Sequence, residues 1–126
     1  MATEYVFPAL PQNTAGWIVS EANGYQSRSQ GVVASGSGIL KSGTVMGQLT
    51  ANAKYVPYAP GASDGSQNAV AFLYEDTDAT SADVSRTFLD RNMEYHRAEI
   101  VFAGTPTTGQ KNTAYAALEA RGMKGR

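Results

Sequence analysis

The chain has 126 residues, of which 42% are hydrophobic and 17% charged, and its formal net charge is −1. These values predict one globular domain rather than a disordered or coiled-coil protein. The small net charge argues against a nucleic-acid-binding protein, which needs a basic surface to displace phosphate counterions. The lack of cysteine excludes disulfides, thiolate zinc sites and cysteine nucleophiles. Thirteen glycines and five prolines favour short strands joined by turns.

The first 24 residues are predicted to form an extended arm. Pro8 and Pro11 restrict the backbone and remove two amide donors, which disfavours a helix or a central strand. The arm is nevertheless rich in apolar side chains, namely Tyr5, Val6, Phe7, Leu10, Trp17 and Ile18. Either these side chains fold back on the protein's own core, or they dock on another protein and become ordered there. Neither a secretory signal nor a membrane span is predicted anywhere in the chain.

Short apolar runs separated by turn residues predict a β body from residue 25 onward. Within the second predicted strand, Val45 and Met46 point to opposite faces, and Gly47 marks a bulge or a close approach. Pro57 limits the third strand and indicates an edge position. The fourth is apolar on both faces, which predicts a central strand. The predicted strands are Ser27–Ser35, Gly43–Thr50, Lys54–Tyr58, Ala69–Glu75, Arg86–Asn92 and Glu99–Phe102.

The connections and the C-terminal region show different signals. Residues 60–67, which contain Asp64-Gly65, are predicted to form a surface loop, and residues 76–83 a polar turn. Thr107 and Gln110 have the spacing of a capping box, so a helix is predicted to begin there. Its narrow apolar stripe consists of Ala114, Ala117 and Leu118, and Gly122 is predicted to cap its end. The fold class is therefore mainly β with one short C-terminal helix.

No group of polar residues predicts catalysis or metal binding. His96 is the only histidine, and its spacing from Glu94 and Glu99 matches no familiar ligand pattern. The glycine-rich run at residues 36–43 lacks the lysine of a phosphate-binding loop, since Thr44 stands in its place. The acidic residues between 75 and 83 lack the spacing of a calcium loop, and no G-x-S-x-G elbow is present. The sequence thus predicts no enzyme, cofactor or metal.

The order of several segments is more informative than any single motif. The run GSGILKSGTVMG at 36–47 is followed by KYVPY at 54–58, DGSQNAVA at 64–71, Glu75-Asp76 and AEIVF at 98–102. In this order and spacing, residues 25–102 resemble the head decoration proteins of lambda-like tailed phages. The resemblance implies a β-clip-like single domain over residues 25–126, preceded by a capsid-binding arm over residues 1–24.

The resemblance also implies a partner and a location. We expect a homotrimer bound to the major capsid protein on the outer surface of the expanded head, at three-fold positions, where it stabilises the virion against packaged DNA. No nucleic-acid or membrane partner is expected, and synthesis is expected in the host cytoplasm. The predicted capsid-binding residues are Tyr5, Val6, Phe7, Pro8, Leu10, Pro11, Trp17 and Ile18. Two alternatives stay open: another head or tail structural protein, and a carbohydrate-binding β-clip module using Tyr55, Tyr58 and Tyr74.

Overall fold

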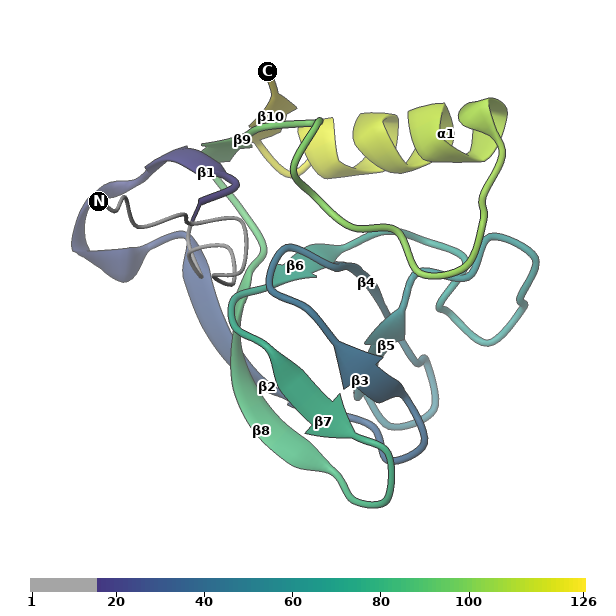
Figure 1. Ribbon diagram of the computed structural model, residues 1–126. Coiled ribbons are helices and arrows are strands. Elements are labelled where there is room, and N and C mark those ends of the chain that lie inside the picture. The colour runs from purple at the N-terminus through teal and green to yellow at the C-terminus, as the bar shows by residue number, and fades with distance from the viewer. Residues whose placement is uncertain (1–15) are drawn as a thin grey trace, which may run out of the picture.

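The computed structural model describes residues 16–126, which form ten short strands, one 3-10 turn and one α-helix (Figure 1). The mainly-β fold with a single short C-terminal helix is confirmed. The elements are β1 (Ile18–Glu21), η2 (Asn23–Tyr25), β2 (Arg28–Val33), β3 (Gly38–Leu40), β4 (Val45–Gln48), β5 (Tyr55–Pro57), β6 (Ala71–Leu73), β7 (Thr77–Ala79), β8 (Val84–Leu89), β9 (Met93–Tyr95), α1 (Thr108–Glu119) and β10 (Met123–Gly125).

Five of the strands close into a barrel in the order β2, β5, β4, β6 and β8. A second sheet has the order β1, β9, β10, with β1 antiparallel and β10 parallel to β9. The remaining strands, β3 and β7, form a two-stranded antiparallel ribbon. In Figure 1 the three-stranded sheet and α1 lie at the top of the molecule, and the ribbon lies in front of the barrel.

Side chains that alternate in direction along the barrel strands contribute to two separate hydrophobic cores. In β4, Val45 enters the core shared with α1 and the three-stranded sheet, and the next residue, Met46, enters the core shared with the ribbon. In β6, Phe72 joins the first core, while its neighbours Ala71 and Leu73 join the second. All five side chains are fully buried. Because successive strand residues point to opposite faces, a strand between two cores must be apolar throughout, which confirms the predicted central strand.

The predicted helix start and the predicted close approach are both confirmed. The Gln110 amide donates to the Thr107 hydroxyl at 3.2 Å, and the Thr107 amide donates to the Gln110 side chain at 2.8 Å. Gly122, with φ at +82°, turns the chain from α1 into β10. A Cβ on Gly47 would lie 2.7 Å from the backbone of Ser66. Only glycine allows the 60–67 loop to approach β4 this closely.

Three sequence predictions about strands are wrong. The strand containing Pro57 is not an edge strand, because β5 lies between β2 and β4 in the barrel. It tolerates the proline because Pro57 is its last residue and the next amide, that of Tyr58, still donates to the Val45 carbonyl of β4 at 3.0 Å. Residues 76–83 are not only a turn, since residues 77–79 form β7 and pair with β3. Within the described part of the chain, residues 99–102 contribute only an isolated bridge between Val101 and Thr44.

Candidate functional site

The structure locates two of the eight predicted capsid-binding residues. Trp17 and Ile18 lie at the beginning of the described chain, immediately before and within β1. The other six, Tyr5, Val6, Phe7, Pro8, Leu10 and Pro11, lie outside the described residues, so their role stays a prediction. Residues 16–24, the last part of the predicted arm, lie in the folded body as β1 and η2. The candidate site is therefore the region where the arm joins the body.

Trp17 fixes this junction to the core. Its side chain is only 1% exposed, and its ring packs against Phe72 with the centroids 4.9 Å apart. The indole N–H donates to the Ser42 hydroxyl at 2.8 Å, and the backbone carbonyl accepts the His96 amide at 2.8 Å. A Cβ on Gly43 would lie 3.0 Å from the indole, so glycine there leaves room for the ring. Of the two alternatives for the apolar arm residues, docking on another protein or packing on the protein's own core, the second describes Trp17.

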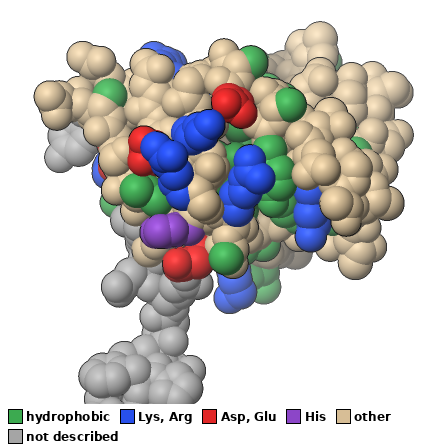
Figure 2. All heavy atoms as spheres, turned by 90° about the horizontal axis from the view of Figure 1, so that it is seen from above, with side chains coloured by type: hydrophobic (Ala, Val, Ile, Leu, Met, Phe, Trp, Pro, Cys, Tyr) green, Lys and Arg blue, Asp and Glu red, His purple; other side chains and the backbone are tan. Residues whose placement is uncertain are grey.

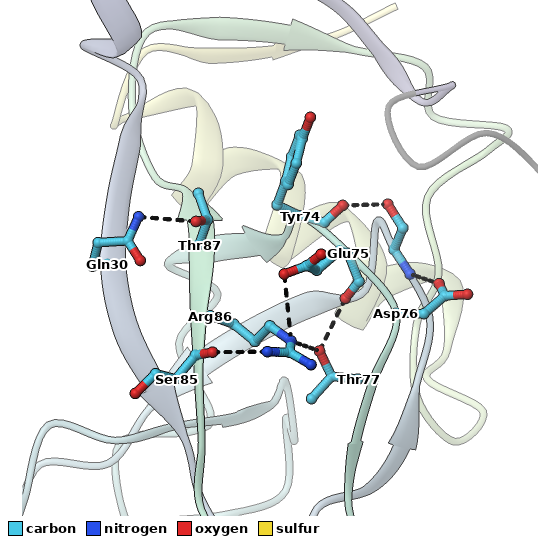
Figure 3. A network of polar contacts seen from close by, with 9 residues as sticks. Gln30, Tyr74, Glu75, Asp76, Thr77, Ser85, Arg86 and Thr87 are labelled. Atoms are coloured by element: carbon cyan, nitrogen blue, oxygen red, sulfur yellow. Dashed lines mark hydrogen bonds and ion pairs between the residues drawn. The ribbon is translucent and has the colours of Figure 1, made fainter.

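A polar network supports the far side of this contact (Figure 3). The Ser42 hydroxyl donates to the Tyr74 carbonyl at 2.6 Å, and the Ser42 amide donates to the Asp76 carboxylate at 2.7 Å. Arg86 donates to the Thr77 hydroxyl at 3.1 Å and lies 3.5 Å from the Glu75 carboxylate. The loop that contacts Trp17 is thereby tied to the segment between β6 and β7. From the sequence, Ser42 belongs to a glycine-rich run and Gly43 begins a predicted strand, and neither indicates a contact with Trp17, which lies at least 25 positions away.

The first strand of the body, β1, lies at the edge of its sheet and could pair with a strand of another protein. Among the described residues, β1 pairs only with β9, so it forms one edge of the three-stranded sheet. The pairing shifts between Ile18 and Ser20, and Val19 within this irregularity is 41% exposed. Ile18 is partly buried against the core below. An edge strand has unpaired backbone groups and can accept another strand.

An ion pair secures the other end of β1. The Arg28 guanidinium donates two hydrogen bonds to the Glu21 carboxylate, each 2.9 Å long, and its carbon lies 4.4 Å from the centre of the Tyr74 ring. The hydrogen bond and charge of Glu21 raise the pKa of Arg28 above its ordinary value. A two-point contact of this kind fixes orientation as well as distance. The end of β1 is thus fastened to β2, and its beginning is fastened through Trp17.

The face around β9, β10 and α1 is rich in charge, and Figure 2 shows Lys and Arg side chains gathered there beside acidic ones. Arg126 contacts Glu94 at 3.0 Å, and Lys124 contacts Glu119 at 3.6 Å. The hydrogen bond from Arg126 lowers the pKa of Glu94, and Glu94 in turn raises that of Arg126. Arg97 lies over the Tyr115 ring, 4.3 Å from its centre. Two of the basic side chains are thus paired with glutamates, but Figure 2 shows more Lys and Arg than Asp and Glu on this face, so its net charge is positive.

The described residues offer no group of three or more His, Asp or Glu side chains that could hold a metal ion. His96 is exposed, and Glu94 already contacts Arg126. The acidic residues of the ribbon and its turns are used in local contacts, as when Asp83 accepts hydrogen bonds from Lys54 and the Ser35 amide. No helix in the described part of the chain is long and apolar enough to cross a membrane.

The three tyrosines proposed for a carbohydrate-binding face do not form one. Tyr55 is 8% exposed and stacks on Phe88 inside the barrel core, with the ring centres 4.0 Å apart. Tyr58 is 3% exposed and donates from its hydroxyl to the Gln110 carbonyl at 3.0 Å. Tyr74 lies beneath the Arg28 guanidinium. Their side chains support the fold and the arm junction instead of presenting a shared aromatic surface.

Comparison with known proteins identifies the relatives of this chain. A search of curated proteins found no match. The family model described as bacteriophage lambda head decoration protein D matches residues 9–123, which is most of the chain and includes the barrel and the helix and ends at the first residue of β10. The resemblance inferred from the order of the sequence segments is thereby confirmed. The chain belongs to the family of bacteriophage lambda head decoration protein D.

Proposed function

We propose that this decoration protein binds the outside of the expanded phage head as a homotrimer at three-fold positions, and that its N-terminal arm pairs with the major capsid protein. The family match over residues 9–123 carries the proposal, because head decoration implies a capsid partner and a place on the virion. Residues 1–24 carry the apolar and proline-stiffened sequence that suits docking on a protein surface.

The junction at Trp17 and β1 supports an arm that transmits force. An arm can hold a shell together only if its attachment to the body resists pulling. Trp17 is buried in the core, and the Glu21–Arg28 ion pair fastens the end of β1. The open edge of β1 is a second element that a capsid strand can extend by backbone hydrogen bonds. The anchor at Trp17 and the open edge of β1 therefore both belong to the β1–β9–β10 sheet.

The mechanism is selective binding without a chemical step. A protein that binds the expanded lattice and not its precursor stabilises the expanded state in proportion to the difference in affinity. Three arms on one trimer raise the effective affinity by about 10²–10⁴ when all three reach their sites. Ordering an arm costs about 1–2 kcal/mol per residue in backbone entropy. Apolar side chains such as Phe7 and Leu10 offset this cost when they fill pockets on the shell.

Sedimentation with purified heads tests the proposal. The full chain is expected to sediment with expanded empty heads and to stay in solution with unexpanded ones. A variant lacking residues 1–16 should remain folded and lose binding to expanded heads. The double variant Phe7→Ser with Leu10→Ser separates apolar docking from backbone pairing, and Thr3→Ser is its matched control. Normal binding by the truncated chain would refute the arm mechanism, and equal binding to both kinds of head would refute state selection.

A further inference from the structure

A broad groove opens on the side of the molecule away from the arm junction. It has a volume of 690 Å³ and lies between the loop before β3, the chain after β5 and the loop before α1. Its walls include Pro57, Tyr58, Pro60, Gly61, Thr105 and Pro106. In Figure 1 the loops that border it are at the right, whereas β1 is at the upper left. An arm that engages the shell from β1 therefore leaves this groove accessible.

The groove differs from the rest of the surface in its chemistry. None of the described residues that line it is charged, although the face around β9, β10 and α1 is dense in Lys, Arg and Glu. Prolines, glycines and alanines form most of its walls. Depletion of charged residues is one compositional feature of the centre of a protein interface. A neutral partner surface with a protruding apolar side chain would fit this groove.

The same chain carries such a side chain close to the groove. Ile39 in the middle of β3 is 77% exposed, the most of any large hydrophobic residue in the described part of the chain. It lies two residues after Ser37, which lines the groove wall, so its backbone is close to the edge of the groove. A single exposed isoleucine is unremarkable by itself. Here, however, the chain carries both an exposed apolar side chain and an uncharged groove that could receive it.

We infer that Ile39 of one copy seats in the groove near Gly61 of the next copy, so that this head-to-tail contact builds the trimer. A contact between two different patches of one chain is heterologous, and it closes into a ring when the rotation between copies permits. Because Ile39 and the groove are close together in the chain, each copy can present both near the three-fold axis of the proposed trimer. The inference rests on the proposed trimer and adds the residues that form it. It also leaves β1 and the arm free for the shell.

Mass measurement of the full chain in solution is the first test. Light scattering after size-exclusion chromatography should give the wild-type mass of three chains of 13.3 kDa each. Ile39→Asp should give the mass of one chain with an unchanged far-UV spectrum, because a carboxylate would have to be buried in the groove. Asn112→Asp adds the same charge on an exposed part of α1 and should remain trimeric. Ile39→Asp at the trimer mass would overturn the inference.

Disulfide trapping tests directly whether residues 39 and 61 of two copies lie close together. The chain has no cysteine of its own, so introduced cysteines can pair only with each other. A Cβ on Gly61 meets nothing within 4 Å, so Gly61→Cys is sterically free. Ile39→Cys and Gly61→Cys chains, mixed and oxidised, should form a cross-linked dimer. Neither variant alone should do so, and Asn112→Cys mixed with Ile39→Cys is the control. Cross-linking by Ile39→Cys alone would mean that two β3 edges face each other, which overturns the head-to-tail contact.

Failure of this inference is distinguishable from failure of the proposed function. A wild-type chain of monomer mass, or a trimer that Ile39→Asp leaves intact, overturns the contact described above. Sedimentation with expanded heads then reports separately whether the arm still binds the shell. If Ile39→Asp is monomeric, its binding to heads should weaken through loss of the three-arm advantage, by about 10²–10⁴-fold. Truncation of the arm should abolish binding without changing the trimer mass.

Discussion

Replacing Trp17 by alanine should destabilise the whole body and not merely loosen the arm. The indole is 1% exposed and packs against Phe72 within the core that joins the barrel to α1 and the β1–β9–β10 sheet. Truncating a buried aromatic side chain to alanine costs about 3–5 kcal/mol, because transfer energy is lost and a cavity remains. This is a large share of the ~5–15 kcal/mol that stabilises a typical domain. Trp17→Phe keeps the ring contact and loses the hydrogen bond to Ser42, so about 1–2 kcal/mol is expected.

Urea unfolding followed by far-UV circular dichroism measures both variants at one fixed protein concentration, since the proposed assembly would make apparent stability concentration-dependent. The midpoint should fall in the order wild type, Trp17→Phe, Trp17→Ala, with an unchanged slope. Trp17→Ala should also bind expanded heads less well, because the arm loses its fixed base. A loss below about 1 kcal/mol for Trp17→Ala would refute the buried position of the indole. Wild-type head binding together with wild-type stability would make Trp17 irrelevant to the junction.

Further predictions concern three positions, Tyr95, Gly47 and Asp83. The buried Tyr95 hydroxyl makes no well-aligned hydrogen bond, although Arg97 lies close enough to oppose the rise of its pKa, so Tyr95→Phe should leave unfolding free energy at pH 7 unchanged or raised; a loss above about 2 kcal/mol would contradict this. Burial also raises the pKa of Tyr95 to about 12, so wild-type stability should fall as pH rises from about 10 to 12, and Tyr95→Phe should remove that part of the slope. Gly47→Ala should cost about 1–3 kcal/mol in urea unfolding through backbone contact, whereas Gly61→Ala should change little; equal effects would refute the close approach. The hydrogen bond from Lys54 lowers the pKa of Asp83, so its stabilising effect is present above the ordinary aspartate pKa and lost as pH falls through the lowered value. Asp83→Asn should therefore lower Tm at about pH 7 and not at about pH 2, and a pH-independent difference would contradict the ion pair.

Local sequence signals were sufficient wherever the structure depends on neighbouring residues. The start of α1 was predictable because Thr107 and Gln110 exchange hydrogen bonds over three positions. The opposite directions of Val45 and Met46 follow from the geometry of any strand. The order and spacing of segments across residues 25–102 were enough to indicate the family, which the match over residues 9–123 confirms.

What the sequence could not decide depends on contacts between distant residues. Whether β5 is central or at an edge is set by its partners β2 and β4, and nothing within Tyr55–Pro57 reports them. Residues 77–79, within a segment predicted to be a polar turn, form a strand because β3 supplies the other half of the ribbon. Trp17 reads as an arm residue by position, yet Ser42, Gly43 and Phe72 enclose it. Composition and periodicity indicate which faces of the strands are apolar. Only the tertiary structure determines which surface covers each face, because strands that pair are distant in the sequence and neither one specifies its partner locally.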